Sequence, residues 1–312
     1  MTILVTGALG HIGSGLIREL PLFFPDAKIK LLDNLMTSRY CSLFNLPKNG
    51  NYNFIEEDLR TVDLDELLPE VDVVVHLAAI TDAAGSFEKA VEVENNNFLS
   101  TKNIGDACAK FNIKLITLSS TSVYGSQNSI VDENCNENEL KPQSPYATTK
   151  LKEEKYINKL INEKNLKATV LRFGTIFGTS IGMRFHTAIN KFCWQAVMGK
   201  PISVWETAFN QKRPYLDLND ATKAIIFIIK NDIFNGKIYN VVTHNLTVED
   251  VVNEIKSHIP KLKIEFVNNP IMNQLSYEVS SDQFCKLGFI FEGEVKRGIS
   301  ETIELLKMSN YN

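Results

Sequence analysis

Short apolar runs alternate with longer amphipathic stretches through the first half of the chain. The runs are rich in Val, Ile and Leu, which is typical of buried strands, and the stretches between them have the spacing of helices. Strands that alternate with helices in this way predict an α/β fold with a Rossmann-like, doubly wound parallel sheet, and ligands bind outside the carboxyl ends of such strands. The predicted strands are residues 2–6, 28–32, 53–56, 72–77, 114–118 and 168–172.

The helical stretches are punctuated by residues that start or stop helices. A glycine-rich turn after the first strand leads into a helix that we expect Pro21 to close, and Thr247 begins a capping box with Asp250. The other predicted helices are residues 87–111, 145–164, 219–230, 247–258 and a last one from Gly293, and a strand at 237–242 returns to the sheet.

The order of these elements predicts two parts. Residues 1–172 form a dinucleotide-binding domain, to which segments near 215–242 return, and residues 173–312 form mainly a smaller α/β substrate lobe. The segment 175–214 is read as an excursion from the sheet, and no repeat, low-complexity tract or linker is apparent.

Composition excludes several classes of protein. The 312 residues are 44% hydrophobic and carry a net charge of −4, which gives no electrostatic footprint for nucleic acid. No run of 18 or more apolar residues predicts a membrane span, and the apolar start of the chain lacks a secretory signal, so a cytoplasmic protein is expected. The five Cys residues are odd in number and none are paired as Cys-x-x-Cys, so neither a disulfide framework nor a metal site is predicted.

The first turn has the features of a dinucleotide site. Gly7, Gly10 and Gly13 lie between a strand and a helix, where glycines let the backbone approach a pyrophosphate. Asp33 ends the second strand 20 residues after Gly13, and its carboxylate would bind an adenosine ribose and repel a 2′-phosphate. NAD is therefore favoured over NADP, although Arg39 lies close enough in sequence to keep the second cofactor open.

Further candidates follow the third and fourth strands. Asp58 falls at the adenine end of the sheet or caps a turn, and Ala78 and Ala79 fall at the wall of the dinucleotide cleft. Asn97 lies within a long helix, where Asn is a poor helix former, so we expect its amide to bond a neighbouring backbone or a ligand.

Tyr146 and Lys150 are the strongest candidates for chemistry. Residues four apart are neighbours on a helix, and a cation ~4 Å from a phenolate at an effective dielectric near 20 contributes about 4 kcal/mol, or roughly 3 pKa units. We therefore expect Tyr146 to be a base near neutral pH, with the alternative that both side chains are solvated on an exposed helix. Ser120 ends a central strand, where a hydroxyl would meet substrate and cofactor.

Taken in order, these motifs resemble the extended short-chain dehydrogenase/reductase family, specifically its nucleotide-sugar epimerases and dehydratases. The resemblance covers nearly the whole chain. The matching stretches are 6–13 (TGALGHIG), 33–35 (DNL), 58–59 (DL), 76–79 (HLAA), Asn97 with Thr101 and Asn103, 119–125 (SSTSVYG), 145–150 (PYATTK), 171–178 (LRFGTIFG) and 211–220 (QKRPYLDLND).

The resemblance implies a role for each matching residue. Tyr146 would be the base for a sugar hydroxyl, Lys150 would lower its pKa and bind the nicotinamide ribose, and Ser120 would bond the ketone oxygen. The implied NAD-binding residues are Gly7, Gly10, His11, Ile12, Gly13, Asp33, Asn34, Asp58, Leu59, Leu77, Ala78, Ala79, Asn97, Tyr146 and Lys150. The implied contacts to a nucleotide-diphosphate sugar are Ser120, Thr121, Ser122, Thr175, Arg184, Phe185 and Arg213.

Departures from the family pattern narrow the implied reaction. Thr121 and Ser122 stand where 4,6-dehydratases carry Asp-Glu, and no Cys lies near Ser122 as in the reductases that invert C3 and C5. An NAD-dependent epimerase acting at a sugar carbinol, C4 in most relatives, is expected. The alternatives are a reductase of nucleotide-linked 4-keto sugars that uses NAD(P)H, and a non-catalytic dinucleotide sensor. Thr175 replaces an Asn found in many relatives, which leaves that contact open.

Relatives also suggest a homodimer. The helices predicted at 87–111 and 145–164 each have one apolar face that would pair across it. The sequence does not disclose the sugar, the nucleotide base or the carbon that is inverted.

Overall fold

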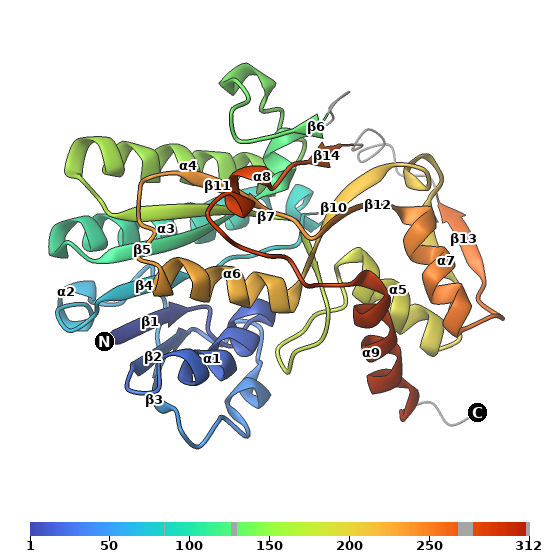
Figure 1. Cartoon of the computed structure of the whole chain (residues 1–312), viewed down its shortest axis with the longest axis horizontal. Helices are drawn as coiled ribbons and strands as arrows, with labels where there is room; N and C mark the ends of the chain where they lie inside the picture. The colour runs from blue at the N-terminus through green and yellow to red at the C-terminus, as the bar shows by residue number, and fades with distance from the viewer. Residues whose placement is uncertain (84, 126–129, 268–276, 310–312) are drawn as a thin grey trace.

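The computed structural model describes residues 1–83, 85–125, 130–267 and 277–309, and its centre is a parallel sheet (Figure 1). Within these residues the sheet has seven strands in the order β11, β7, β5, β4, β1, β2, β3, and every neighbouring pair is parallel. The doubly wound α/β fold predicted from the sequence is thus confirmed. The strands are β1 (Thr2–Thr6), β2 (Lys28–Asp33), β3 (Asn51–Glu56), β4 (Val73–His76), β5 (Lys114–Ser120), β7 (Ala168–Phe173) and β11 (Ile238–Val241).

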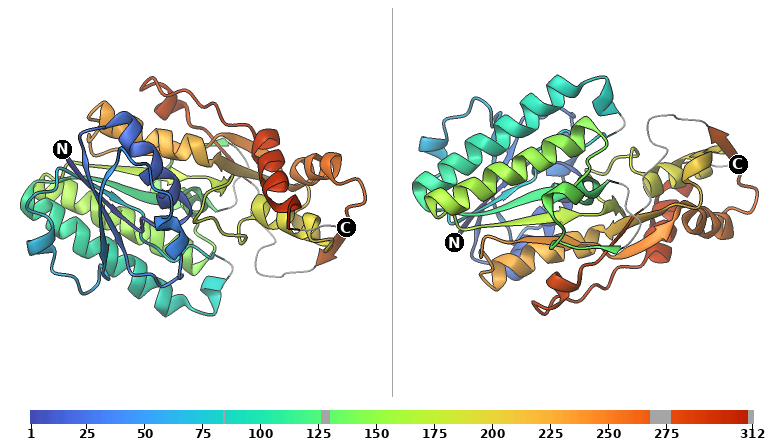
Figure 2. Two further views of the ribbon diagram at one scale, coloured as in Figure 1. Left: turned by 90° about the horizontal axis from the view of Figure 1, so that it is seen from below. Right: turned by 90° about the horizontal axis from the view of Figure 1, so that it is seen from above.

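Helices cover both faces of this sheet, because successive side chains of each buried strand point to opposite sides. Ile3 and Val5 of β1 pack in one apolar cluster with residues of α1 and α6, whereas Leu4 packs in another with residues of α3 and α4. The two views in Figure 2 show these helix pairs on opposite sides of the strands. The helices are α1 (His11–Phe23), α3 (Ala90–Phe111), α4 (Pro145–Lys164) and α6 (Leu218–Lys230).

Pro21 does not close the first helix, and in this respect the sequence prediction is wrong. The helix α1 continues to Phe23 with Pro21 inside it. Proline has no N–H to donate, so the carbonyl of Ile17 loses its helical partner. The hydroxyl of Tyr52 donates to that carbonyl oxygen at 2.7 Å. A residue from a neighbouring strand therefore replaces the missing bond.

Other helix boundaries differ from prediction by a few residues. The helix predicted from residue 87 begins at Ala90, after a 3₁₀ turn at Gly85–Phe87, and the last helix begins at Val295 instead of Gly293. The capping box at Thr247 is confirmed: its hydroxyl accepts from the backbone N–H of Asp250, whose carboxylate accepts from that of Thr247. A short helix α2 spans Leu64–Leu67.

Most of the remaining elements form a lobe beyond one end of the sheet (Figure 1), whereas the short helix α8 packs against β11 through Phe284 and Tyr239. The helices of the lobe surround an apolar cluster that includes Phe177, Ile189, Val251 and Ile299. Pairs and triplets of strands flank the helices, in the groups β8-β10-β12, β9-β13 and β6-β14. The bounds are α5 (Ala188–Val197), α7 (Val248–His258), α8 (Asp282–Cys285), α9 (Val295–Lys307), β6 (Ile130–Val131), β8 (Thr175–Phe177), β9 (Ile202–Trp205), β10 (Lys212–Asp217), β12 (His244–Thr247), β13 (Ile264–Val267) and β14 (Glu278–Val279).

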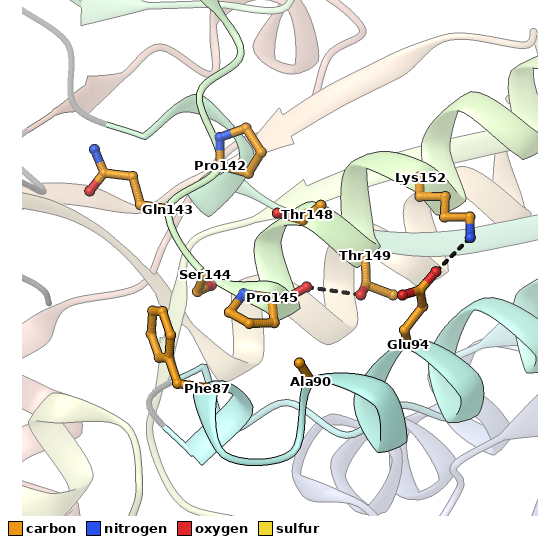
Figure 3. A pocket seen from close by; sticks show the side chains of 10 residues that line it. All are labelled: Phe87, Ala90, Glu94, Pro142, Gln143, Ser144, Pro145, Thr148, Thr149 and Lys152. Carbon is orange, nitrogen blue, oxygen red and sulfur yellow. Dashed lines mark hydrogen bonds and ion pairs between the residues drawn. The ribbon is translucent and has the colours of Figure 1, made fainter.

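A pocket of about 450 Å³ lies at the amino-terminal ends of α3 and α4 (Figure 3). Phe87 and Pro145 line it, and the Nζ atom of Lys152 pairs with a carboxylate oxygen of Glu94 at 2.6 Å along one side. The pocket therefore lies between the two long helices that were predicted to pair across a dimer.

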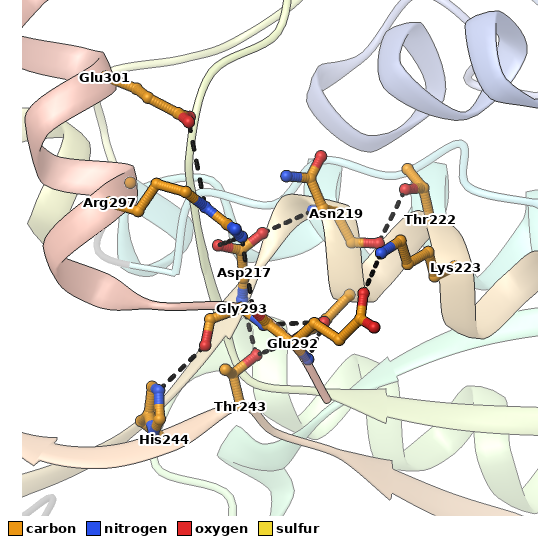
Figure 4. A network of polar contacts seen from close by, with 12 residues as sticks. Asp217, Asn219, Thr222, Lys223, Thr243, His244, Glu292, Gly293, Arg297 and Glu301 are labelled. Atoms are coloured by element: carbon orange, nitrogen blue, oxygen red, sulfur yellow. Dashed lines mark hydrogen bonds and ion pairs between the residues drawn. The ribbon is translucent and has the colours of Figure 1, made fainter. Parts of the chain in front are cut away.

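Hydrogen bonds to one buried carboxylate of α6 tie the carboxyl-terminal segment to that helix, in the polar network around Thr243, Glu292 and Gly293 (Figure 4). Asp220 of α6 accepts hydrogen bonds from the backbone N–H groups of Glu292 and Gly293 and from the hydroxyl of Thr243, at 2.7 to 3.2 Å. A Cβ atom on Gly293 would lie 2.3 Å from that of Asp217, so only glycine fits there. The network holds the approach to α9 against the first turn of α6.

Within the described ranges, none of the helices has the length and apolar character needed to cross a membrane. In the same ranges, no three His, Cys, Asp or Glu side chains gather in a way that could hold a metal ion.

Candidate active site

Two glycines of the turn from β1 into α1, Gly7 and Gly13, lie where a side chain larger than hydrogen does not fit. Gly7 has φ +65°, and a Cβ atom there would lie 2.7 Å from the backbone nitrogen of Ala78. At Gly13 a Cβ atom would lie 2.4 Å from the carbonyl oxygen of Gly7. Gly10 precedes α1 without capping it by a side chain, and no acidic residue occupies the first turn. The backbone N–H groups at the start of α1 are therefore a candidate anion site, of the kind that binds a pyrophosphate.

His11 and Ile12 fix the start of α1 rather than adding charge to it. The Nε2 atom of His11 lies 2.9 Å from the carbonyl oxygen of Gly178, and because a carbonyl only accepts, Nε2 carries the proton. Burial lowers the pKa of His11 to about 4, so the ring is neutral at pH 7. Ile12 packs against the apolar cluster beneath α1.

The acidic residues predicted at the adenosine end lie together at the carboxyl ends of β2 and β3. The carboxylate of Asp33 accepts from the backbone N–H of Leu9 at 3.1 Å and of Leu35 at 3.0 Å, which links the glycine turn to the end of β2. The side-chain amide of Asn34 donates to Asp58 at 2.9 Å.

Asp58 also has a structural role, because it accepts hydrogen bonds from Arg60 in the turn after β3. It accepts from the guanidinium of Arg60 at 2.6 and 2.9 Å, and these hydrogen bonds are the main cause that holds its pKa well below the usual range. It also accepts from the backbone N–H of Arg60, as the turn-capping alternative required. Leu59 is buried beside it, and its carbonyl accepts from the amide of Asn103 at 3.1 Å.

The segment after β4, which was predicted to form the wall of the dinucleotide cleft, is held in place by a side chain of α3. Asn97 is fully buried, and its amide accepts from the backbone N–H of Ile80 at 2.7 Å and donates to the carbonyl of Ile80 at 2.9 Å. These bonds meet the expectation of a neighbouring backbone partner. Any contribution of Asn97 to cofactor binding acts through the segment it holds, in which Leu77, Ala78 and Ala79 are half-buried.

Of the three hydroxyls at the end of β5, those of Ser120 and Ser122 lie together and that of Thr121 lies apart. The oxygen of Ser120 accepts from the backbone N–H of Ser122 at 3.2 Å and from its hydroxyl at 2.9 Å, so the proton of Ser120 is left to be donated elsewhere. Thr121 is buried, and its hydroxyl donates to the carbonyl of Phe173 at 3.4 Å. The structure therefore places Ser120 and Ser122 together, whereas the buried Thr121 side chain bonds the backbone of Phe173.

The helix α4 brings the predicted base and cation to the end of β5. Ser144 caps the helix by accepting from the backbone N–H of Ala147 at 3.1 Å, and Pro145 occupies the first turn. Lys150 is buried, and its ammonium donates to the carbonyl of Leu118 at 3.1 Å. Tyr146 is half-buried, and the solvated-helix alternative is excluded for this pair.

The pKa of Tyr146 is raised, which corrects the prediction from spacing alone. Burial is the largest cause, because a phenolate is poorly solvated in the interior. The charge of Lys150 and a hydrogen bond from Ser120 act to lower the pKa, but the charge of Glu153 raises it further. The prediction from spacing took into account neither the burial of the Tyr146 phenol nor the charge of Glu153.

Glu153 is the residue that sequence reasoning missed. Its side chain is 4% exposed, and one carboxylate oxygen accepts from the ammonium of Lys150 at 2.8 Å. The same oxygen accepts from the hydroxyl of Thr101 at 3.0 Å, and Thr101 in turn lies 3.1 Å from Nε2 of His76. The available signal was the Lys-x-x-Glu spacing on one helix face.

Arg184 and Phe185 approach the site from the segment between β8 and α5. The guanidinium of Arg184 donates to the hydroxyl of Thr81, and the charges of Asp82 and Tyr146 both act on its pKa, which burial lowers. The ring of Phe185 lies tilted against Trp194, with centroids 6.4 Å apart. Arg184 thus lies close enough to the predicted base, Tyr146, for the two charges to interact, whereas Phe185 packs toward α5.

Arg213 and Thr175 lie on neighbouring strands of the small sheet. Burial lowers the pKa of Arg213, and the groups among the described residues that counter this are the phenols of Tyr277 and Tyr215, with no carboxylate among them. A partly buried guanidinium beside neutral phenols is suited to an anionic ligand. Thr175 begins β8 and lies opposite Tyr215 in the register.

Comparison with known proteins gives one family for this arrangement. The sequence profile of the NAD dependent epimerase/dehydratase family matches residues 3–241. The uncharacterized UDP-glucose epimerase YtcB of Bacillus subtilis is 31% identical over 250 residues, which cover 77% of this chain and 76% of the relative.

A longer relative has a name with several activities. A trifunctional UDP-glucose 4,6-dehydratase/UDP-4-keto-6-deoxy-D-glucose 3,5-epimerase/UDP-4-keto-L-rhamnose-reductase of Arabidopsis thaliana is 29% identical over 317 residues, which cover 97% of this chain. The matched region is 46% of that relative, so the chain spans about half its length.

Among solved structures, the UDP-glucuronic acid 4-epimerase of Bacillus cereus, in complex with UDP-glucuronic acid and NAD, superimposes with a TM-score of 0.88. The two chains are 24% identical, and the match covers 99% of this chain and 100% of the other. At this identity the likeness concerns the fold.

Proposed function

This chain belongs to the NAD dependent epimerase/dehydratase family, and from that premise we propose that it is an NAD-dependent epimerase of nucleotide-diphosphate sugars. The observation that carries the proposal is the convergence of Ser120, Tyr146 and Lys150 at the carboxyl end of β5. The solved relative with the same fold is a 4-epimerase, which supports C4 as the carbon.

The residues present fit NAD. The glycine cradle admits a backbone approach that a Cβ atom on Gly7 or Gly13 would block, and the uncapped start of α1 at Gly10 offers N–H groups to the pyrophosphate. Asp33 presents a carboxylate at the end of β2, where it would favour a ribose hydroxyl over a 2′-phosphate. When bound, NAD supplies the hydride acceptor and later the hydride donor of an epimerisation.

Three side chains of this protein would handle the proton and the oxygen of the reacting sugar hydroxyl. In its phenolate form, Tyr146 accepts the proton of the sugar hydroxyl and becomes the neutral phenol, which returns that proton after the sugar has presented its other face. The ammonium of Lys150 stabilises the phenolate during that transfer. Ser120, whose oxygen already accepts two hydrogen bonds, donates its own proton to the sugar oxygen and so stabilises the ketone.

The anionic part of the substrate has two cationic partners. Arg213 has phenols instead of a carboxylate as its nearest charge-modifying groups, so a diphosphate would supply the missing negative charge. Arg184 lies between Asp82 and Tyr146, where it would meet the same ligand closer to the base. Both relatives and the solved structure are named for UDP-sugars, which makes UDP the first nucleotide to test.

The two positions after Ser120 do not carry the side chains that an elimination reaction would need. A dehydratase needs an acid and a base beyond the tyrosine, and Thr121 and Ser122 offer neither: Thr121 bonds the backbone of Phe173, and Ser122 donates to Ser120. Reduction of a nucleotide-linked 4-keto sugar is the second candidate, because the Arabidopsis relative includes a keto-sugar reductase in its name.

One experiment separates these reactions. The protein with catalytic NAD is incubated with UDP-, GDP-, dTDP- and CDP-sugars and followed by NMR. A new anomeric signal from an epimer is expected with at least one UDP-sugar. Consumption of NADH with a 4-keto sugar, without any epimer signal, would make the protein a reductase; binding of NAD without turnover of any sugar would make it a sensor.

The variant Tyr146→Phe tests the assigned base. The substitution removes the hydroxyl and keeps the ring, so we expect kcat to fall at least about 100-fold while NAD remains bound. Turnover is measured by the same NMR signal, and cofactor content by absorbance after denaturation. Full turnover by this variant would contradict the mechanism.

Two further proposals concern the oligomeric state of the protein and its cellular compartment. The apolar side chains of Phe87, Val91 and Leu99, which are 37%, 73% and 40% exposed, lie on or beside α3 and support a homodimer through α3 and α4. All five Cys side chains are free thiols, which supports a reducing compartment such as the cytoplasm.

A further inference from the structure

We propose that Glu153 is a positioning residue that controls the charge shared by Lys150 and Tyr146, and thereby the pH range in which this chain turns over its substrate. The inference rests on the proposed function, because it concerns the protonation of the assigned base. It adds a residue that neither the catalytic motif nor the comparisons single out.

The contact between Glu153 and Lys150 is a buried ion pair. Their side chains are 4% and 6% exposed, and the ammonium lies 2.8 Å from Oε2 of Glu153, three residues further along α4. The second carboxylate oxygen, Oε1, is buried without a hydrogen-bond partner among the described residues. A buried charge of this kind is retained only where it is paired, so the carboxylate and the ammonium depend on each other.

A chain of hydrogen bonds ends at Glu153, and in each bond the donor is the group farther from Glu153. Because the hydroxyl of Thr101 donates its single proton to Glu153, it accepts from Nε2–H of His76. Nδ1 of His76 then accepts from the hydroxyl of Thr6, 2.8 Å away, and Thr6 accepts from the backbone N–H of Ala78 at 3.4 Å. A chain with one polarity therefore links the cofactor wall to the carboxylate and stabilises its negative charge.

Two other charged groups act on the pair: Glu154 helps to raise the pKa of Lys150, and Arg184 helps to lower that of Tyr146, but among the carboxylates the effect of Glu153 on Lys150 is the larger. The carboxylate of Glu154 is engaged with Arg172 at 2.7 and 2.9 Å. On β4, burial and the charge of Lys150 lower the pKa of His76 to about 3, so that ring is neutral. Arg184 acts to lower the pKa of Tyr146 and is itself influenced by Asp82.

Glu153 moves both members of the pair in the same direction. Burial would lower the pKa of Lys150, but the Glu153 and Tyr146 charges outweigh it and raise that pKa. The ammonium has three N–H bonds; Leu118 and Glu153 take two, which leaves one for a ligand. Glu153 thus keeps Lys150 protonated while offsetting part of its effect on the Tyr146 phenol.

The variant Glu153→Gln tests this role in the NAD-loaded protein. Gln keeps the shape and can accept from Lys150 and Thr101, but it removes the negative charge. We expect the acid limb of the kcat profile to move toward lower pH by about 1 unit or more, since the phenol ionises more readily. We expect the alkaline limb to move the same way, because Lys150 loses its proton more readily.

Matched variants separate charge from packing. Glu163→Gln removes a 60%-exposed carboxylate from the same helix and should leave both limbs in place. Glu153→Asp keeps the charge and should restore most of the wild-type profile. If Glu153→Gln does not fold, Glu153→Met removes the charge while filling the same volume and should show the same acid shift. Unmoved limbs in a folded charge-removing variant, or a shift toward alkaline pH, would overturn the proposal.

A second readout needs no substrate. The near-ultraviolet absorbance of the phenolate is titrated in NAD-loaded protein, and subtracting the titration of Tyr146→Phe isolates Tyr146. The same subtraction with Glu153→Gln should show Tyr146 ionising at lower pH, and identical titrations would refute the inference. If Tyr146 shifts as expected but no sugar is epimerised, the proposed function fails and the role of Glu153 stands.

Discussion

At the scale of single residues, the site depends on where charge is buried. Lys150 and Glu153 compensate each other inside α4, and Ser120 is left with one proton to donate. The negative charge of Glu153 therefore offsets part of the effect of the Lys150 ammonium on Tyr146, and burial together with that charge holds the pKa of Tyr146 above the ordinary value of a tyrosine. Residue types at the right spacing predicted which groups meet, but the balance of their charges comes from the side chains packed around them.

The glycine cradle leads to a second prediction at this scale. Gly7→Ala places a Cβ atom 2.7 Å from the backbone nitrogen of Ala78 at a φ of +65°, and the left-handed conformation alone costs about 1–2 kcal/mol. We expect NAD affinity to fall about tenfold or more, because the turn and the wall of the cleft must move apart. Calorimetric titration with NAD measures the effect.

Gly15→Ala is the matched control in α1. A Cβ atom there would make an ordinary contact, 3.5 Å from the Thr222 side chain. Alanine improves helix propensity by up to about 1 kcal/mol, so stability should be unchanged or increased and NAD affinity unchanged. Equal NAD affinity of the Gly7 variant and this control would contradict the cradle.

At the scale of elements, tertiary contacts decide where helices end. Pro21 is a strong stop signal in the sequence, yet α1 passes through it because Tyr52 satisfies the carbonyl of Ile17. By contrast, Ser144 and Thr247 cap their helices through local hydrogen bonds, so those starts could be predicted. Local signals are dependable where the partner lies within a few residues.

A double-mutant cycle tests the contact at Pro21. Tyr52→Phe should destabilise the protein by about 1 kcal/mol, because the Ile17 carbonyl loses its partner. In a Pro21→Ala background the new backbone N–H bonds that carbonyl, so the same Tyr52 change should cost little, with a coupling of about 1 kcal/mol. Urea unfolding of the four proteins gives the values. Additive effects would mean that Tyr52 does not replace the missing helical bond.

At the scale of the whole molecule, a parallel sheet places the carboxyl ends of β1, β2, β3, β4 and β5 at one edge, and most of the predicted cofactor residues lie at or just after these ends. The segment that leads into α9 is held against α6 by the hydrogen bonds of Gly293 to Asp220. The division near residue 172 stays a prediction, and strand β11 from the later part of the chain pairs with β7 in the main sheet.

The proposed homodimer is tested by one surface change. Val91→Glu introduces a charge at a 73%-exposed apolar position of α3, and burial of an unpaired charge in an interface is strongly unfavourable. We expect light scattering at micromolar concentration to give the dimer mass for the wild type and the monomer mass for the variant. Ile290→Glu, at a 75%-exposed position outside both helices, should remain dimeric. A monomeric wild type would contradict the dimer.

The sequence by itself determined the fold class, the order of strands and helices, the glycine turn and the pairing of Tyr146 with Lys150. These follow from periodicity and short spacings, which are local properties of the chain. Only the tertiary structure decided that Thr121 bonds the backbone of Phe173, that Asn97 holds Ile80 and that Glu153 offsets Lys150. The Lys-x-x-Glu spacing could have indicated that Glu153 meets Lys150, but its burial and the partners distant in sequence, such as Thr101 and Phe173, follow from no local pattern.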